Sequence, residues 1–310
     1  ISEEMANLGA QLGTGSNLDM SLVTLSALKA NLEKSLAVFA DVVLNPSMPA
    51  TEFARLKQEQ LALIQREKVQ PVQMALRVLP VKIYGETHAY GMPLTGSGTE
   101  QSVSSITVDD LKKFHGTWFK PNHSTLIVVG DTTLAEIQPM LEKVLGAWKP
   151  GDTPAKNISK VEHQAQGRVY LIDKPGSIQS MIIAGHIAPP QANPQEIAIE
   201  TMNTSLGGMF TSRINMNLRE EKGWSYGAQS FFWPARGQRP FMAYAPVQTD
   251  KTKESLAEIK KELTDVVGAR PLSEQELDMA QNNLTLQLPG ARETMNRVAG
   301  SIEEIVRFGL

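Results

Sequence analysis

Two short matches at nearly the same offset are the feature that most constrains the fold of this chain. Gly9-Ala10-Gln11 recurs as Gly227-Ala228-Gln229, 218 residues later, and Ser35-Leu36-Ala37 recurs as Ser255-Leu256-Ala257, 220 residues later. In both copies the first tripeptide opens an expected strand, a second strand follows, and the second tripeptide falls in an expected helix. Because the order and the offsets agree, we interpret the chain as part of a duplicated unit.

The size of this repeat predicts the domain organisation. A unit of about 220 residues does not fit twice into 310 residues, so we expect the first copy to lack its front and the second its tail. The expected element order, β-β-α-β-β-α-α, indicates an α+β fold with mixed or antiparallel sheets and helices packed on one face. We expect a first repeat at 1–150, a Pro- and Gly-containing linker at 151–159, and a second repeat at 160–310.

Apolar periodicity and turn residues predict the individual elements. Helices are expected at residues 31–44, 52–70, 194–205, 252–267 and 273–286. Strands are expected at 124–130, 168–173 and 180–188, and a hairpin from 225–233 and 241–247. Three helix starts have the spacing of a capping box, namely Thr107 with Asp110, Thr133 with Glu136, and Ser273 with Glu276.

Composition and missing motifs exclude several classes of function. The net charge of −3 disfavours nucleic-acid binding, and no apolar run approaches the roughly 18 residues that a membrane span needs. The chain has no cysteine, which excludes thiol catalysis and disulfides, and no G-x-S-x-G elbow. None of the five histidines has another three to five residues away, so we expect no helical zinc pair and no metal held by this chain.

Four segments, in the right order, resemble the pitrilysin/insulysin family of zinc metallopeptidases, which includes mitochondrial processing peptidase. They are His88-Ala-Tyr-Gly91, the run from Ile106 to His115, the run from Lys120 to Asp131 (KPNHSTLIVVGD), and Leu206-Gly-Gly208 continuing to Tyr226 (LGG…SR…LRE…G..Y). The resemblance implies a repeated α+β unit arranged as two halves that close on peptide. This agrees with the duplication found above.

The resemblance also implies where zinc belongs. The family holds zinc with an inverted H-x-x-E-H motif and a distant glutamate, and the motif's own glutamate activates water. This sequence has no H-x-x-E-H, and ungapped alignment places the third ligand near Leu63, with Glu59 and Glu67 one helical turn to either side. We therefore interpret the chain as a non-zinc half, inactive alone, whose zinc is in a partner half upstream on the same chain or on a separate subunit.

Arg219 and Tyr226 match a pair that the family supplies from the partner half to the zinc site of the opposite half. The implied role is catalytic in trans. The arginine forms a bidentate hydrogen bond to a substrate carbonyl or carboxylate, and the tyrosine hydroxyl donates a hydrogen bond to the developing oxyanion. A second interpretation stays open, in which Arg219 pairs with Glu220 or Glu221 and Tyr226 is an aromatic of an edge strand.

The expected substrate is an unfolded peptide, which this family adds as a strand to an exposed sheet edge. We assign peptide binding to five residues around the expected strand 225–233: Gly207, Gly208, Ser225, Phe231 and Phe232. The aromatic side chains among them fit a hydrophobic core equally well, and the sequence does not decide between the two.

Three functions remain open at this stage. The chain is the non-zinc half of a metalloendopeptidase, a binding or scaffold relative without catalytic duty, or a zinc-bearing half whose motif has been removed. The presence of both Arg219 and Tyr226 favours the first, and Leu63 opposes the third. A periplasmic location is expected from the resemblance to exported bacterial members.

Overall fold

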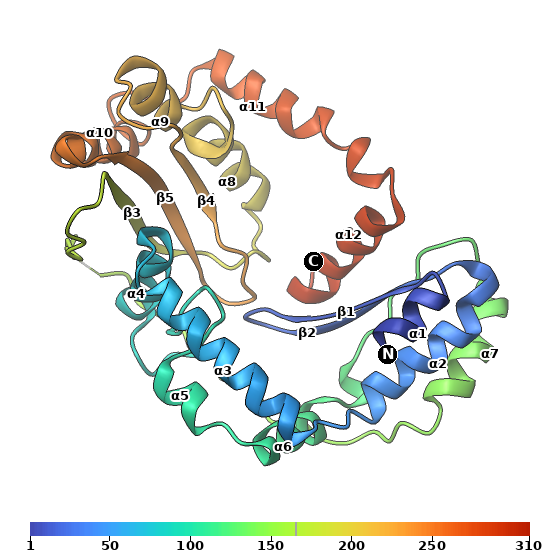
Figure 1. Cartoon of the computed structure of the whole chain (residues 1–310). Helices are drawn as coiled ribbons and strands as arrows, with labels where there is room; N and C mark the ends of the chain where they lie inside the picture. Colours follow the sequence, from blue (N-terminus) through green and yellow to red (C-terminus); the bar gives the residue numbers. More distant parts are fainter. Residues whose placement is uncertain (165) are drawn as a thin grey trace. The chain divides into compact units, whose positions relative to one another are not determined.

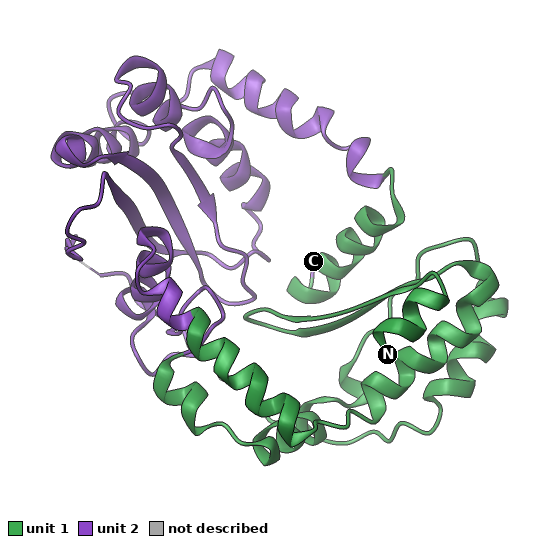
Figure 2. Ribbon diagram, viewed as in Figure 1, with its two compact units in different colours: residues 1–63, 99–157, 293–309 green, residues 64–98, 158–292, 310 purple. Residues whose placement is uncertain are grey.

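A computed structural model of the chain describes residues 1–164 and 166–310. The described chain forms two compact units (Figures 1 and 2): residues 1–63, 99–157 and 293–309 in unit 1, and residues 64–98, 158–292 and 310 in unit 2. Each unit consists of several separate sequence segments and is defined by its compactness. The unit boundaries therefore do not correspond to the boundaries of the predicted repeats. The expected division at 150 and 160 therefore stays a prediction.

Unit 1 contains an antiparallel pair of strands and the helices around it. In β1 and β2 the register runs from Gln11 opposite Ser26 to Ser16 opposite Ser21. The apolar face predicted for α2 is buried, and α2 packs against β2 and α7. The elements are α1 (Ser2–Asn7), β1 (Gln11–Ser16), β2 (Ser21–Ser26), η1 (Lys29–Asn31), α2 (Leu32–Leu44), α3 (Ala50–Glu67, continuing into unit 2), α5 (Glu100–Ser105), α6 (Val108–Trp118), η2 (Pro121–His123), α7 (Leu134–Leu145) and α12 (Met295–Phe308).

Unit 2 is built on a three-stranded antiparallel sheet with the order β3-β5-β4. The predicted hairpin is confirmed in a shorter form: β4 pairs with β5 from Gln229 to Phe232, and an isolated antiparallel bridge joins Ser225 to Val247. The elements are α4 (Pro71–Tyr84), β3 (Gln179–Ala188), α8 (Glu196–Asn203), η3 (Thr204–Gly208), α9 (Arg213–Asn215), η4 (Met216–Glu221), β4 (Gln229–Phe232), β5 (Arg239–Gln248), η5 (Thr249–Lys251), α10 (Thr252–Asp265), α11 (Glu274–Leu286) and η6 (Gly290–Arg292).

The core of unit 2 lies between this sheet and the helical segments that cover it. Alternate residues of the central strand β5 point into the core, as expected for strand periodicity, and meet side chains from η3, α9, η4 and α10. Each large apolar side chain buried here contributes about 1.5–3 kcal/mol. The core members include Phe241, Ala243, Ala245, Val247, Leu206, Ile214, Leu218 and Ile259.

The structure confirms the tandem α+β fold predicted from the duplicated tripeptides. The order β1-β2-α2-α3 in the first copy matches β4-β5-α10-α11 in the second. The first strand of each copy begins at the glutamine of its tripeptide, Gln11 or Gln229. Ser35 in α2 and Ser255 in α10 are both fully buried at 0% exposure. Equivalent sequence positions thus occupy equivalent places in the two copies.

All three predicted capping boxes are confirmed. In each, the capping hydroxyl accepts the backbone N–H three residues on, and that residue's carboxylate accepts the N–H of the cap. The reciprocal hydrogen bonds satisfy N–H groups that a helix end leaves unpaired. They fix the first turns of α6, α7 and α11.

Two predicted strands are not formed. Within the described residues, neither 124–130 nor 168–173 is hydrogen-bonded into a ladder. The apolar side chains of 168–173 are exposed, with Val169 at 81% and Leu171 at 90%, and those of 124–130 are partly exposed, with Leu126 at 47%. An apolar run indicates that a segment favours burial, whereas a strand also requires a partner strand for its backbone hydrogen bonds. Both segments are apolar, but among the residues that the structure describes no strand pairs with either of them.

Candidate functional site

The structure brings Arg219 and Tyr226 together in unit 2. Arg219 is in η4, a π-helical segment, and its guanidinium carbon Cζ lies 5.2 Å from the centre of the Tyr226 ring. The Tyr226 side chain is 84% exposed, so its hydroxyl is open to a ligand. π-Helical turns occur frequently at functional sites, and this one presents a cation and a phenol side by side.

The turn between the two residues depends on Gly223. The Gly223 N–H donates to the Arg219 carbonyl at 3.1 Å, and the Trp224 N–H donates to the Leu218 carbonyl at 2.9 Å. Gly223 has a φ of +65°, a left-handed conformation that glycine adopts without strain. This residue ends the π-helical segment and directs the chain toward Tyr226.

Phe210 is a third member of the site that the sequence reasoning missed. The Cζ of Arg219 lies 4.7 Å from the centre of the Phe210 ring, which itself is 57% exposed. Its only signal in the sequence is its place between Gly208 and Ser212, inside a segment that carries the family resemblance. The guanidinium therefore contacts two aromatic rings, a favourable cation–π arrangement.

The buried side chain of Asn215 forms hydrogen bonds to both sides of this site. The sequence reasoning missed this residue as well. Its Nδ2 donates to the Phe210 carbonyl at 2.7 Å, and its Oδ1 accepts from the Ala228 N–H at 3.0 Å. Asn215 is only 4% exposed. The two segments that carry Phe210 and Tyr226 are thus held by one amide in α9.

The alternative partner predicted for Arg219 is present too. Arg219 Nε lies 3.2 Å from Oε1 of Glu220, and both side chains are partly exposed. An exposed ion pair of this kind contributes about 0–1 kcal/mol. It leaves the other guanidinium N–H groups available, because arginine has five donors. The ion pair and the aromatic contacts therefore coexist.

Gly207 and Ser225 have structural partners that explain their places in the sequence. Gly207 is buried against β4, where an added Cβ would lie 2.3 Å from the backbone nitrogen of Ser230. The Ser225 hydroxyl donates to the Pro246 carbonyl at 2.6 Å and accepts from the Gly227 N–H at 3.1 Å, which fixes the chain on both sides of Tyr226. Gly208 is exposed beside them. Their assignment to peptide binding stays a prediction.

Phe231 and Phe232 point to opposite faces of β4, as neighbours in a strand do. Phe232 packs against the core, with its ring centre 5.1 Å from that of Phe241, and Phe231 is half-buried on the other face. The outer edge of β4 is partly occupied, since the Ser230 carbonyl accepts from Asn203 Nδ2 at 3.2 Å. A role for either phenylalanine in peptide binding stays a prediction.

Replacing Gly207 with alanine is expected to lower the free energy of unfolding by about 1–2 kcal/mol, because the new methyl group collides with the backbone nitrogen of Ser230 as well as with its side chain. Chemical denaturation followed by circular dichroism measures the loss. Gly227→Ala is a control in the same unit, since its Cβ would meet only Asn215 Oδ1, at an ordinary 3.9 Å. An equal loss in both variants would contradict the close-packing explanation.

The glutamates near the expected third zinc ligand do not fit a metal site. Leu63 carries only hydrocarbon, Glu59 forms an ion pair with Arg55, and the buried Glu67 carboxylate accepts from Arg77 and two hydroxyls. No group of three or more histidine, aspartate or glutamate side chains in the described residues has the arrangement of a metal site. In the same residues, none of the helices combines the length and the apolar character that crossing a bilayer requires.

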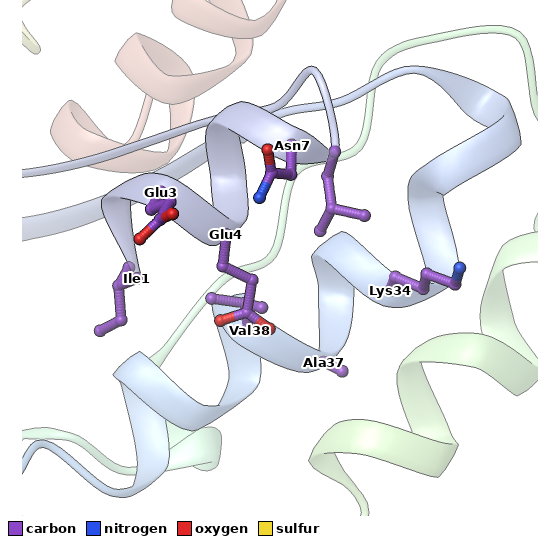
Figure 3. A pocket seen from close by; sticks show the side chains of 8 residues that line it. Ile1, Glu3, Glu4, Asn7, Lys34, Ala37 and Val38 are labelled. Carbon is purple, nitrogen blue, oxygen red and sulfur yellow. The ribbon is translucent and has the colours of Figure 1, made fainter.

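Two surface hollows are lined by residues other than Phe210, Arg219 and Tyr226. Figure 3 shows the first, in unit 1 between α1 and α2, where Glu4 and Lys34 lie among apolar neighbours such as Val38. The second lies in unit 2, and its walls include the paired side chains of Arg213 and Glu276. The charged groups of the second hollow are largely engaged with one another, which indicates a structural role.

Comparison with known proteins identifies the family. The model of the peptidase M16 inactive domain matches residues 105–284, more than half of the chain. An uncharacterized zinc protease of Rickettsia bellii is 24% identical over 310 residues, a match covering 98% of this chain and 71% of that protein. A crystal structure of a peptidase M16 inactive domain from Pseudomonas fluorescens superposes with a TM-score of 0.89 at 25% identity, covering 100% of this chain and 73% of that one.

A more distant structural neighbour has the same fold within a longer chain. The periplasmic protease PqqL from Escherichia coli matches with a TM-score of 0.75 at 14% identity, over 99% of this chain and 35% of PqqL. At this identity the likeness concerns the fold alone. The family match agrees with the residues that carried the pitrilysin resemblance, several of which lie between 105 and 284. The chain therefore belongs to the family of peptidase M16 inactive domains.

Proposed function

We propose that this chain is the non-zinc half of a two-half zinc metallopeptidase and that it helps to bind unfolded peptide for cleavage by a partner half carrying H-x-x-E-H. The observation that carries the proposal is the contact between Arg219 and the exposed Tyr226. A cation beside an exposed phenol offers two kinds of hydrogen-bond donor to one ligand. Membership in the inactive-domain family supports the assignment of zinc to the partner half.

The two side chains have distinct roles in this proposal. Arg219 binds a carbonyl or carboxylate of the peptide through its free guanidinium N–H groups, which holds the peptide in register. The Tyr226 hydroxyl donates a hydrogen bond to the oxyanion that forms when water attacks the scissile carbonyl. Both groups act on a site completed by the partner half, so this chain alone is inactive.

A scaffold relative without catalytic duty is the second candidate. The observation that favours it is the ion pair between Arg219 and Glu220, which gives the arginine a partner without any ligand. The exposure of Tyr226 favours the catalytic role, because an aromatic side chain that only stabilises the fold is ordinarily buried. A zinc-bearing half is disfavoured by Leu63.

Arg219→Ala and Tyr226→Phe are each expected to lower peptide hydrolysis tenfold or more, since one oxyanion donor contributes about 10²–10³ in rate. The measurement is cleavage of a quenched fluorescent peptide by an H-x-x-E-H partner half of the family, with and without this chain. This chain alone with zinc is the control, and no cleavage is expected from it. A mixture no more active than the partner half alone would favour the scaffold, and cleavage by this chain alone would overturn the non-zinc assignment.

A periplasmic location is part of the proposal. Its support is the resemblance to exported bacterial members and the description of the structural neighbour PqqL as a periplasmic protease. Fractionation of the native host, with an antibody to this chain, tests it. Recovery with cytoplasmic markers would contradict it.

A further inference from the structure

We propose that Phe210 is a positioning residue for Arg219, holding the guanidinium for contact with the peptide. The inference rests on the proposed function of Arg219. It adds a residue to the site that neither the motif nor the family match assigns. Its basis is the contact between Arg219 Cζ and the Phe210 ring at 4.7 Å, which is shorter than the 5.2 Å contact with Tyr226.

The exposure of Phe210 is the first reason to assign it a role beyond packing. Its side chain is 57% exposed and is absent from the core cluster of unit 2, so burial does not explain a phenylalanine at this position. The Phe210 ring contacts the Arg219 guanidinium.

The anchoring of the Phe210 backbone is the second reason. The Phe210 carbonyl accepts from Asn215 Nδ2 at 2.7 Å, and the same amide receives the Ala228 N–H close to Tyr226. Asn215 is buried and belongs to α9, directly before the segment η4 that carries Arg219. The backbone from which the Phe210 ring extends is therefore held by a hydrogen bond to a buried side chain.

The chemistry of arginine explains what such a ring contributes. A free arginine side chain samples many rotamers, and binding a ligand through it requires that this freedom be lost. Aromatic rings contact the face of the guanidinium, whereas its N–H groups donate within its plane. Phe210 therefore restricts Arg219 before peptide arrives and does not occupy the N–H groups that lie outside the ion pair with Glu220.

Phe210→Leu tests the proposal, because it keeps an apolar side chain and removes the ring. In the mixture with the H-x-x-E-H partner half, kcat/KM is expected to fall about two- to fivefold, as loss of a cation–π contact at an exposed site predicts. Phe210→Tyr restores a ring and is expected to stay within twofold of the wild type. Phe114→Leu, at another exposed phenylalanine in α6, is the control and should leave kcat/KM unchanged.

A double-mutant cycle separates this inference from the proposed function. If Phe210 acts through Arg219, then Phe210→Leu causes no further loss in an Arg219→Ala background. An equal fold-loss in both backgrounds, or a Phe210→Tyr variant as weak as Phe210→Leu, would overturn the inference. A normal rate for Phe210→Leu beside a damaged Arg219→Ala would also overturn it while leaving the proposed function intact. An Arg219→Ala variant of normal activity would instead refute the proposed function.

Discussion

Replacing Glu67 with glutamine is expected to lower the free energy of unfolding by about 3–5 kcal/mol, the range for breaking a buried ion pair from one side. Glu67 lies at the end of α3 and is only 5% exposed. Its Oε2 accepts from Arg77 Nη1 at 2.6 Å, from Ser97 Oγ at 2.6 Å and from Thr95 Oγ1 at 3.1 Å. Glutamine keeps the shape of the side chain and removes the charge, so a buried guanidinium is left without its counterion.

The same helix provides the control for this measurement. Glu59 pairs with Arg55 at 2.6 Å, but both side chains are more than half exposed. Glu59→Gln is therefore expected to change the free energy of unfolding by no more than about 0.5 kcal/mol. Urea denaturation of the two variants compares the same substitution in buried and exposed pairs. A similar small effect in both would mean that Arg77 finds enough support in Ser97 and the Gly98 carbonyl.

The part of the fold that could be predicted from sequence depends on local signals. The capping box at Ser273 and the apolar face of α2 each involve residues three or four positions apart, so one short window contains the whole interaction. The duplicated tripeptides also allowed the order of the elements in the two copies to be predicted. The prediction of a strand at 168–173 was wrong because the segment has the apolar residues of a strand, whereas the partner strand that it would pair with cannot be read from the segment itself.

The candidate site was predictable only in part, for a related reason. Arg219 and Tyr226 were found from the family pattern, and the contact between them follows from a turn at Gly223. Phe210 and Asn215 were missed because their roles depend on how η3, α9 and η4 follow one another in space. No periodicity links residue 210 to residue 219. Phe232 likewise packs in the core because its ring contacts Phe241 of β5, and the sequence around Phe232 does not indicate this contact.

Acidification is expected to remove a stabilising contribution from the pair formed by Glu276 and Arg213. Arg213 donates to Glu276 through Nε at 2.6 Å and Nη2 at 2.7 Å, and its guanidinium is buried. The hydrogen bond from Arg213, followed by those from Ser273, lowers the pKa of Glu276 from 4.5 to about 2. The folded state therefore holds the charged carboxylate more strongly than the unfolded state does.

The sign of the pH dependence follows from this lowered pKa. Above pH 4.5 the carboxylate is charged in both states and the stabilisation is complete, and it is lost as the pH falls toward 2. Because the Glu276 side chain is 30% exposed, solvent reduces the contribution to about 2 kcal/mol. Glu276→Gln retains a capping side chain for α11 but does not titrate. Its stability deficit should be largest near pH 7 and shrink toward pH 2 in urea denaturation, and a deficit independent of pH would show that packing rather than charge holds this pair.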